Sequence, residues 1–410
     1  MFGPILAILL AVVLVAVLRA SGELRAGKLF GPLIVAGYVV RLVIQSFVRD
    51  IQLFSHELGS DAESYEAFGR VISLVWRHTG IHFVTQTELP QIGAASLPPN
   101  LFALVIHLND GPSRLGCTSL VALAAAITAL NVYKLALQFG ATERDAFLVT
   151  MLFYFDPAFL DYTSDMFKDG LVICFTMGAL GSALRLTFKF SVIHAIIGSI
   201  CVLALWHVRF YLVFVTLAPL GVGLVGVGSR SLARPVIAAL LLSALMIGLV
   251  AFTDVLQLTA ERANETFMVG TSEAVMQSNA SGGSGVEFDD GGSPFGALGL
   301  KLAYTLFSPF FWKGGSVGFH IGKLDAFIWY YLIYRSLRAV RVADRRLLLA
   351  LVVFLVPCTL MYAMSMANVG LIVRQRLVIV AATAVLAAIY HPRRVELVTS
   401  ASPAAIMPSQ

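Results

Sequence analysis

The sequence predicts an all-α protein, a polytopic transmembrane bundle of about eleven spans with further helices that lie on or re-enter its outer surface. Hydrophobic residues make up 58% of the chain and charged residues only 13%, whereas soluble domains carry about 25% charge. Apolar runs of about 15 to 22 residues recur, a length that crosses a hydrocarbon core about 30 Å thick. The chain has no basic run suited to nucleic acid, so we expect no nucleic-acid partner.

Lysine and arginine in short loops assign the cytoplasmic side of each span. No cation precedes the first apolar run, and Arg19, Arg25 and Lys28 follow it. This order is the reverse of that in a signal peptide. The N-terminus is therefore expected outside and the C-terminus in the cytoplasm, most simply in a bacterial inner membrane. The expected spans are about 2–18, 29–47, 117–138, 146–162, 167–186, 191–206, 210–228, 235–253, 324–340, 347–367 and 376–391.

These spans form a single expected transmembrane domain, 1–395, followed by a short cytoplasmic tail, 396–410. Two long outer loops interrupt it, at about 48–116 and about 254–323. The first loop contains a short apolar segment, Asn100–Leu108, that we interpret as an interfacial helix because it is too short to cross the membrane.

The second outer loop contains an apolar segment, 298–312, that is broken by Pro309. A full crossing there would place the Arg335–Arg346 cations outside, so we expect a re-entrant or surface helix. The preceding glycine- and serine-rich interval, 278–293, carries three carboxylates that are candidate ligands for a divalent cation. They are Glu287, Asp289 and Asp290. A solvated loop is the simpler interpretation, and the sequence leaves the cofactor unknown.

The first outer loop concentrates carboxylates beside a predicted membrane helix. Asp61 stands four residues before Tyr65, so both can face one site if the segment is helical. A carboxylate placed there can accept a proton from an attacking hydroxyl. The simpler interpretation makes Asp61 the N-cap of an amphipathic helix, Ala62–Trp76. Asp50 and Glu57 are weaker catalytic candidates, as second carboxylates or metal ligands.

Several charges in short outer turns break the positive-inside rule, and the predicted topology gathers them at one membrane face. Singly, such charges are most simply explained by side chains that reach to the membrane surface. Together they indicate a site for an anionic headgroup, most plausibly a lipid phosphate. With Tyr65, the candidate substrate-binding residues are Lys168, Asp169, Arg209, Arg374 and Arg376.

Arg41 is a different case because it lies in the middle of a predicted span. It follows Lys28 by 13 positions, or roughly 20 Å along a helix. An isolated charge at this depth is expensive. We therefore expect Arg41 either to extend outward or to meet a carboxylate in a polar cleft.

A set of short motifs resembles the polytopic GT-C glycosyltransferases, which use polyprenyl-phosphate sugars, and related bacterial exopolysaccharide assembly proteins. The motifs are Ser60-Asp61 with Tyr65, Asp156-Pro157, Ser164 to Asp169, Trp206 to Tyr211, Phe307 to Trp312, and Asn368-Val369-Gly370 with Arg374-Gln375-Arg376. The resemblance implies that Asp61 is the catalytic base and that basic residues at outer helix ends hold the lipid phosphate. The chain differs from the family in its predicted outside N-terminus.

The sequence therefore favours a membrane glycosyltransferase that moves a sugar from a polyprenyl-phosphate donor to a glycan or lipid acceptor outside the membrane, with membrane lipid as a further partner. A polysaccharide polymerase or ligase is the first alternative, and would depend on Arg209, Arg374 and Arg376 more than on Asp61. A lipid-linked glycan transporter is supported only by Arg41. A non-catalytic scaffold of an envelope assembly complex remains open.

Overall fold

Every regular secondary-structure element that the structure describes is a helix. The computed structural model describes residues 2–25, 27–51, 59–93, 95–226, 285–286, 288–289, 295–312 and 317–390. Over these ranges the pairing of extended backbone is limited to one isolated bridge, Gly285 to Asn368. Six of the described helices are long and apolar enough to cross a membrane. The expected span at 235–253, most of the second outer loop and the tail at 396–410 lie outside the described residues.

The helices follow one another with short connections over most of the described chain. They are α1 (Phe2–Ala20), α2 (Phe30–Ile51), α3 (Gly59–Thr79), η1 (Pro90–Ile92), α4 (Leu97–Leu108), α5 (Arg114–Gln138), α6 (Glu143–Tyr154), α7 (Pro157–Asp161), α8 (Asp169–Phe188), α9 (Val192–Trp206), α10 (Tyr211–Val225), α14 (Leu298–Phe307), α15 (Val317–Ala339), α16 (Arg345–Met364) and α17 (Val369–Ile389). The six candidate spans are α1, the 30–47 part of α2, α5, α8, α16 and α17.

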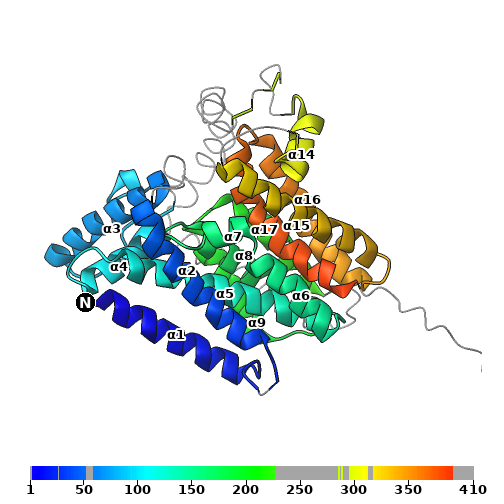
Figure 1. Cartoon of the computed structure of the whole chain (residues 1–410), viewed down its shortest axis with the longest axis horizontal. Helices are drawn as coiled ribbons and strands as arrows, with labels where there is room; N and C mark the ends of the chain where they lie inside the picture. Colours follow the sequence, from blue (N-terminus) through cyan, green and yellow to red (C-terminus); the bar gives the residue numbers. More distant parts are fainter. Residues whose placement is uncertain are drawn as a thin grey trace, which may run out of the picture.

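The starts and ends of successive helices gather at two opposite ends of the bundle. Near the N-terminus, where α3 and α4 also lie (Figure 1), the Gly3 amide donates to Asn109 Oδ1 at 3.2 Å. Arg114 pairs there with Asp165. The start of α1 thus lies beside the end of α4, and the start of α5 beside the link into α8. We call this the Asp61 end, because Asp61 of α3 forms a hydrogen-bonded ion pair there with Arg374, near the start of α17.

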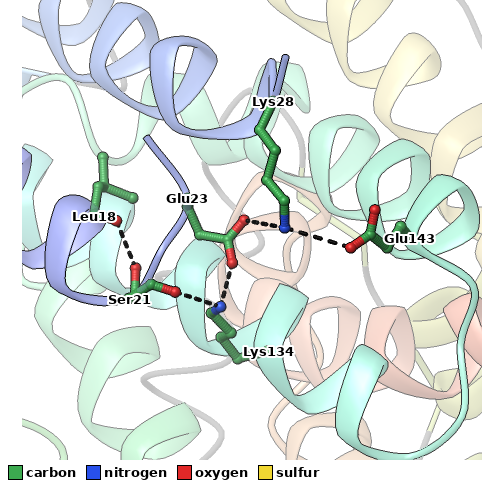
Figure 2. Close-up of polar contacts among 6 residues, drawn as sticks. All are labelled: Leu18, Ser21, Glu23, Lys28, Lys134 and Glu143. Atoms are coloured by element: carbon green, nitrogen blue, oxygen red, sulfur yellow. Dashed lines mark hydrogen bonds and ion pairs between the residues drawn. The ribbon is translucent and has the colours of Figure 1, made fainter. Parts of the chain in front are cut away.

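The opposite ends of the same helices are tied to one another by a second group of contacts. Four residues, which we call the Glu23 cluster, hold the α1–α2 turn against α5 and α6; they are Glu23, Lys28, Lys134 and Glu143 (Figure 2). Lys28 Nζ lies 3.5 Å from Glu23 Oε2 and 3.4 Å from Glu143 Oε1, and Lys134 Nζ contacts Glu23 Oε1 and the Ser21 carbonyl. Each Glu23 oxygen therefore faces a lysine.

One expected span is broken. The sequence pattern predicted a continuous helix over 146–162, but the structure divides this stretch into α6 and α7. Pro157 lacks the amide hydrogen that a continuing helix needs. The Asp156 carboxylate instead accepts from the Phe159 amide at 3.1 Å and caps a new helix. The Asp156-Pro157 pair thus turns the chain just before it reaches the Asp61 end.

Two expected helix starts also differ from the structure. α17 begins at Val369 rather than near 376, because Asn368 Oδ1 accepts from the Leu371 amide at 3.1 Å as an N-cap. Arg374 and Arg376 therefore lie inside the helix. α4 begins at Leu97, so its two prolines occupy the first turn, where a missing amide hydrogen costs little.

Buried arginines close two helix ends. The Arg41 side chain is fully buried and donates to the Tyr154 carbonyl at 2.8 Å, where α6 ends, and to Thr163 Oγ1 at 2.6 Å. The Arg335 Nε donates to the Ala387 carbonyl near the end of α17 at 2.9 Å. The last carbonyls of a helix lack partners and carry partial negative charge. The expectation that Arg41 extends outward or meets a carboxylate is therefore wrong: the carbonyls of Gly37 and Tyr154 and the Thr163 hydroxyl accept its hydrogen bonds.

Candidate functional site

Five charged side chains converge at the Asp61 end, and we call them the Asp61 cluster. They come from the first turn of α3, the start of α8, the α9–α10 link and the second turn of α17. The cluster consists of Asp61, Lys168, Asp169, Arg209 and Arg374. The predicted proximity of Asp61 to Arg209 and Arg374 is confirmed, because ion pairs connect Asp61 to Arg374, Arg374 to Asp169 and Asp169 to Arg209.

Asp169 is the buried centre of this arrangement, with a side chain only 2% exposed. Its Oδ2 accepts from Arg374 Nε at 2.6 Å, and its Oδ1 accepts from Arg209 Nη2 at 3.2 Å. Asp169 occupies the first turn of α8, where the helix dipole also favours a negative charge. One carboxylate therefore holds two guanidinium groups that come from distant parts of the chain.

Arg374 connects the buried centre to the surface. Its Nη1 donates to Asp61 Oδ2 at 2.5 Å, and its guanidinium carbon lies 5.4 Å from the ring centroid of Tyr162 and 5.3 Å from that of Phe167. Its Nη2 is buried and has no hydrogen-bond partner among the described residues. A buried N–H without an acceptor is costly, so this nitrogen offers a donor to an incoming oxygen.

Lys168 adds a further positive charge. Its ammonium lies 6.0 Å from the ring centroid of Tyr65, within the range of a cation–π contact. Burial, followed by repulsion from Arg209, lowers the pKa of Lys168 to about 8. The charge of this lysine is therefore sensitive to pH near neutrality, unlike that of the two arginines.

Asp61 forms the exposed side of the cluster. Its side chain is 47% exposed, compared with 12% for Arg374. α3 begins at Gly59, so Asp61 lies in its first turn and is not the N-cap. Of the two carboxylates in the cluster, Asp61 is thus the one that a molecule from outside reaches first.

The charges of the Asp61 cluster do not balance. Three cations face two carboxylates, so the formal sum of these five side chains is one positive charge when Lys168 is protonated and the adjacent Asp161 is neutral. The neighbouring pair of Arg114 and Asp165 is neutral and leaves this sum unchanged. A partly buried excess of positive charge with an unpaired N–H attracts an anion, and arginine matches the oxygens of phosphate or carboxylate groups.

The sequence reasoning did not single out Asp161 as a site residue. It ends α7, beside Tyr162, whose ring lies under Arg374. Burial, and then repulsion from Asp165, raises the pKa of Asp161 to about 7, while Arg374 acts in the opposite direction. The only signal in the sequence is that Asp161 follows the helix break at Asp156-Pro157 by one short turn.

The remaining predicted site residues are placed elsewhere or not described. Arg376 points away from the Asp61 cluster and pairs with Asp325 of α15 at 2.8 Å. The Asp50 side chain and the whole of Glu57 lie outside the described residues. Among the residues that the structure describes, no three His, Cys, Asp or Glu side chains form a group suited to a metal ion. Glu287 and Asp290 of the second outer loop are not described.

Comparison of the chain with protein-family models, with curated proteins and with solved structures gives no match.

Proposed function

We propose that the protein is a membrane glycosyltransferase that moves a sugar from a polyprenyl-phosphate donor to a glycan or lipid acceptor. The observation that carries the proposal is the Asp61 cluster, in which a half-exposed carboxylate is bonded to an arginine that retains one unpaired, buried N–H. A transfer of this kind needs a base for the acceptor hydroxyl and cations for the departing phosphate. The cluster contains both, within a single network of ion pairs.

In the proposed reaction, the donor phosphate binds Arg374 and Lys168. In the structure Asp61 accepts a hydrogen bond from Nη1 of Arg374. An arriving phosphate competes with the Asp61 carboxylate for this donor and releases the carboxylate. Asp61 then removes the proton from the acceptor hydroxyl, whose oxygen attacks the anomeric carbon of the sugar. The bond between that carbon and the phosphate oxygen breaks, and polyprenyl phosphate leaves with the bonding electron pair. Arg209 acts through Asp169, which holds Arg374 in place.

The proposed setting is a bacterial inner membrane crossed about eleven times, with the Asp61 end outside. Its support is the distribution of cations, since short loops at the Glu23 end carry most of them. They include Arg19, Arg25, Arg144, Lys189, Arg338, Arg341, Arg345 and Arg346. This orientation places the N-terminus outside and the C-terminus in the cytoplasm, and assigns α4 and α14 to the outer surface. Membrane lipid surrounds the donor's polyprenyl chain.

The test is transfer of a radiolabelled sugar by purified protein in lipid, with a panel of polyprenyl-phosphate donors. We expect Asp61→Asn to lower turnover by about 100- to 10,000-fold, the usual contribution of a general base. The matched control is Asp165→Asn, because Asp165 also forms an ion pair with an arginine, Arg114, at the Asp61 end. Equal turnover of the wild type and the Asp61 variant would remove Asp61 from the chemistry.

A polysaccharide polymerase or ligase is the second candidate. Its support is that Arg209 and Arg374, not Asp61, surround the buried centre of the cluster. The same assay with lipid-linked oligosaccharides distinguishes the two candidates. A polymerase would elongate the glycan, tolerate Asp61→Asn and lose activity when Arg374 is replaced.

A further inference from the structure

A second buried polar group lies on the other side of α17, and we call Asp156, Asp325 and Arg376 the Asp156 cluster. The three residues are 1%, 2% and 1% exposed. Arg376 Nη2 donates to Asp325 Oδ2 at 2.8 Å, and its Nη1 donates to the Ser308 carbonyl at 2.6 Å. Four parts of the fold therefore meet here: the α6–α7 break, the end of α14, α15 and α17.

The depth of this group makes its charges expensive. Arg376 is the eighth residue of α17, which places it roughly 10 Å along the helix from Val369. Charged side chains inside a membrane bundle occur where they pair or serve a function. The Asp156 cluster does not contribute to the Asp61 cluster, because Arg374 and Arg376 are separated by about 200° around the helix. The inference below therefore does not depend on the proposed transferase activity.

The two carboxyl groups of the Asp156 cluster are in direct contact. Asp156 shares a side-chain hydrogen bond with Asp325, and the charges acting on Asp156 are those of Asp325 and Arg376. A hydrogen bond between two carboxyl groups requires one proton, because an ionised carboxylate only accepts. Two adjacent buried carboxylates beside one guanidinium do not both ionise at neutral pH.

Unpaired polar atoms mark the same place. When both aspartates are ionised, Asp156 Oδ1, Arg376 Nε and Ser308 Oγ are buried without a hydrogen-bond partner among the described residues. The ring of Trp329 covers Arg376, with 5.5 Å between the guanidinium carbon and the ring centroid. The group is thus built from polar atoms that the protein alone does not satisfy, and apolar side chains separate it from water.

Other titratable groups on the surrounding helices have partners of their own. Lys301 of α14 lies 5.8 Å from the ring centroid of Phe288, and the Tyr330 hydroxyl of α15 donates to the Phe307 carbonyl. Arg41 of α2 is held by the carbonyls of Gly37 and Tyr154 and by Thr163. Among the contacts that the structure describes, Arg376 is the cation that pairs with Asp325.

We propose that the Asp156 cluster is a proton-binding site, in which Asp156 and Asp325 share a single proton and Arg376 neutralises the remaining charge. The proton joins the N-cap of α7 to α15, and through Arg376 to α14 and α17. Release of the proton leaves two negative charges against one guanidinium and separates these helices. The site therefore couples proton binding to the packing of the broken helix.

Infrared spectroscopy of the full chain in lipid tests the proposal. Isotope-labelled aspartate assigns the carbonyl-stretch band of a protonated aspartic acid. The pKa of Asp161 is about 7, so the spectrum is recorded about two pH units higher, where Asp161 is ionised. We expect the band to persist at this pH. Exposed carboxyl groups are fully ionised there. Asp156→Asn should remove the band, because its amide donates to Asp325 in place of the proton. Asp165→Asn is the matched control and should retain it.

The wild-type spectrum alone can overturn the proposal, even if the variants do not fold. Absence of the band would show that no buried aspartic acid holds a proton at this pH. Retention of the band in a folded Asp156→Asn protein would assign the proton elsewhere. Loss of the band when sodium chloride replaces choline chloride would show that a metal ion occupies the site in place of the proton.

Discussion

The two ends of the helix bundle use ion pairs in different ways. At the Glu23 cluster, two lysines face two glutamates, and the formal charges cancel. At the Asp61 cluster, three cations face two aspartates, and Arg374 retains a buried N–H without a partner. The first group is charge-neutral and holds the α1–α2 turn in place, and its buried Glu23 Oε2 lies 3.5 Å from Lys28 Nζ without a hydrogen bond. The second has a net positive charge and a buried donor without a partner, and the proposed phosphate site rests on these two features.

Among the changes at the two ends of the bundle, replacement of Arg374 should have the largest effect on turnover and on phosphate binding. Arg374→Gln removes the cation that contacts both Asp61 and Asp169. We expect turnover to fall about 100- to 1,000-fold, as when a preorganised donor to a developing anion is lost. Binding of polyprenyl phosphate, measured separately by calorimetry, should weaken in parallel. Normal binding by a folded variant would contradict the phosphate site.

The pH dependence of phosphate binding should identify Lys168. A lysine is charged below its pKa, and burial lowers the pKa of Lys168 to about 8. Binding should therefore weaken as the pH rises through about 8. Lys168→Arg should abolish this step, because arginine stays charged. A smaller step from Asp161, whose pKa is about 7, should remain in both proteins. A step near pH 8 in the arginine variant would assign the titration to another group.

Tyr65 should have a smaller effect. Its buried ring faces the Lys168 ammonium at 6.0 Å, a contact that contributes about 0.5–1 kcal/mol because the cation is partly exposed. Tyr65→Leu should therefore weaken polyprenyl-phosphate binding about two- to fivefold. Tyr65→Phe keeps the ring and is the matched control, so it should bind as the wild type does. An equal loss in both variants would point to the hydroxyl group.

Changes at the Glu23 cluster should leave donor binding and turnover unchanged. Lys134→Met removes one of the two lysines that face the buried Glu23. The loss of a partner from a buried charged group costs about 1–3 kcal/mol in the free energy of unfolding. A lower midpoint of thermal unfolding with normal transfer is expected. A large loss of transfer would show that the two ends are functionally coupled.

The meeting of Asp61 with Arg209 and Arg374 could be predicted because successive helices that run in opposite directions return every second connection to the same end of the bundle. That Asp169 is the buried centre of the cluster could not be predicted, because Asp169 meets Arg209 and Arg374 across 40 and 205 positions of sequence. Such pairings depend on how the helices pack, which a hydropathy pattern does not specify.

The separation of Arg374 from Arg376 was more accessible to sequence reasoning. Residues two apart on a helix do not share a face, but this applies only if the helix begins before both. The Asn368 N-cap is the signal that α17 starts early. Likewise, the Asp156-Pro157 pair contained the information for the break between α6 and α7, and thus for the Asp156 cluster.

The most direct test of the central claim is equilibrium binding of polyprenyl phosphate to the wild type and to Asp61→Asn, with Asp165→Asn as control. The account predicts that Asp61→Asn binds about three- to tenfold more tightly, because the competing carboxylate charge on Arg374 is gone; a tenfold change corresponds to about 1.4 kcal/mol. Turnover should fall at the same time. Unchanged or weaker binding would contradict the claim that Asp61 and the donor phosphate compete for Arg374.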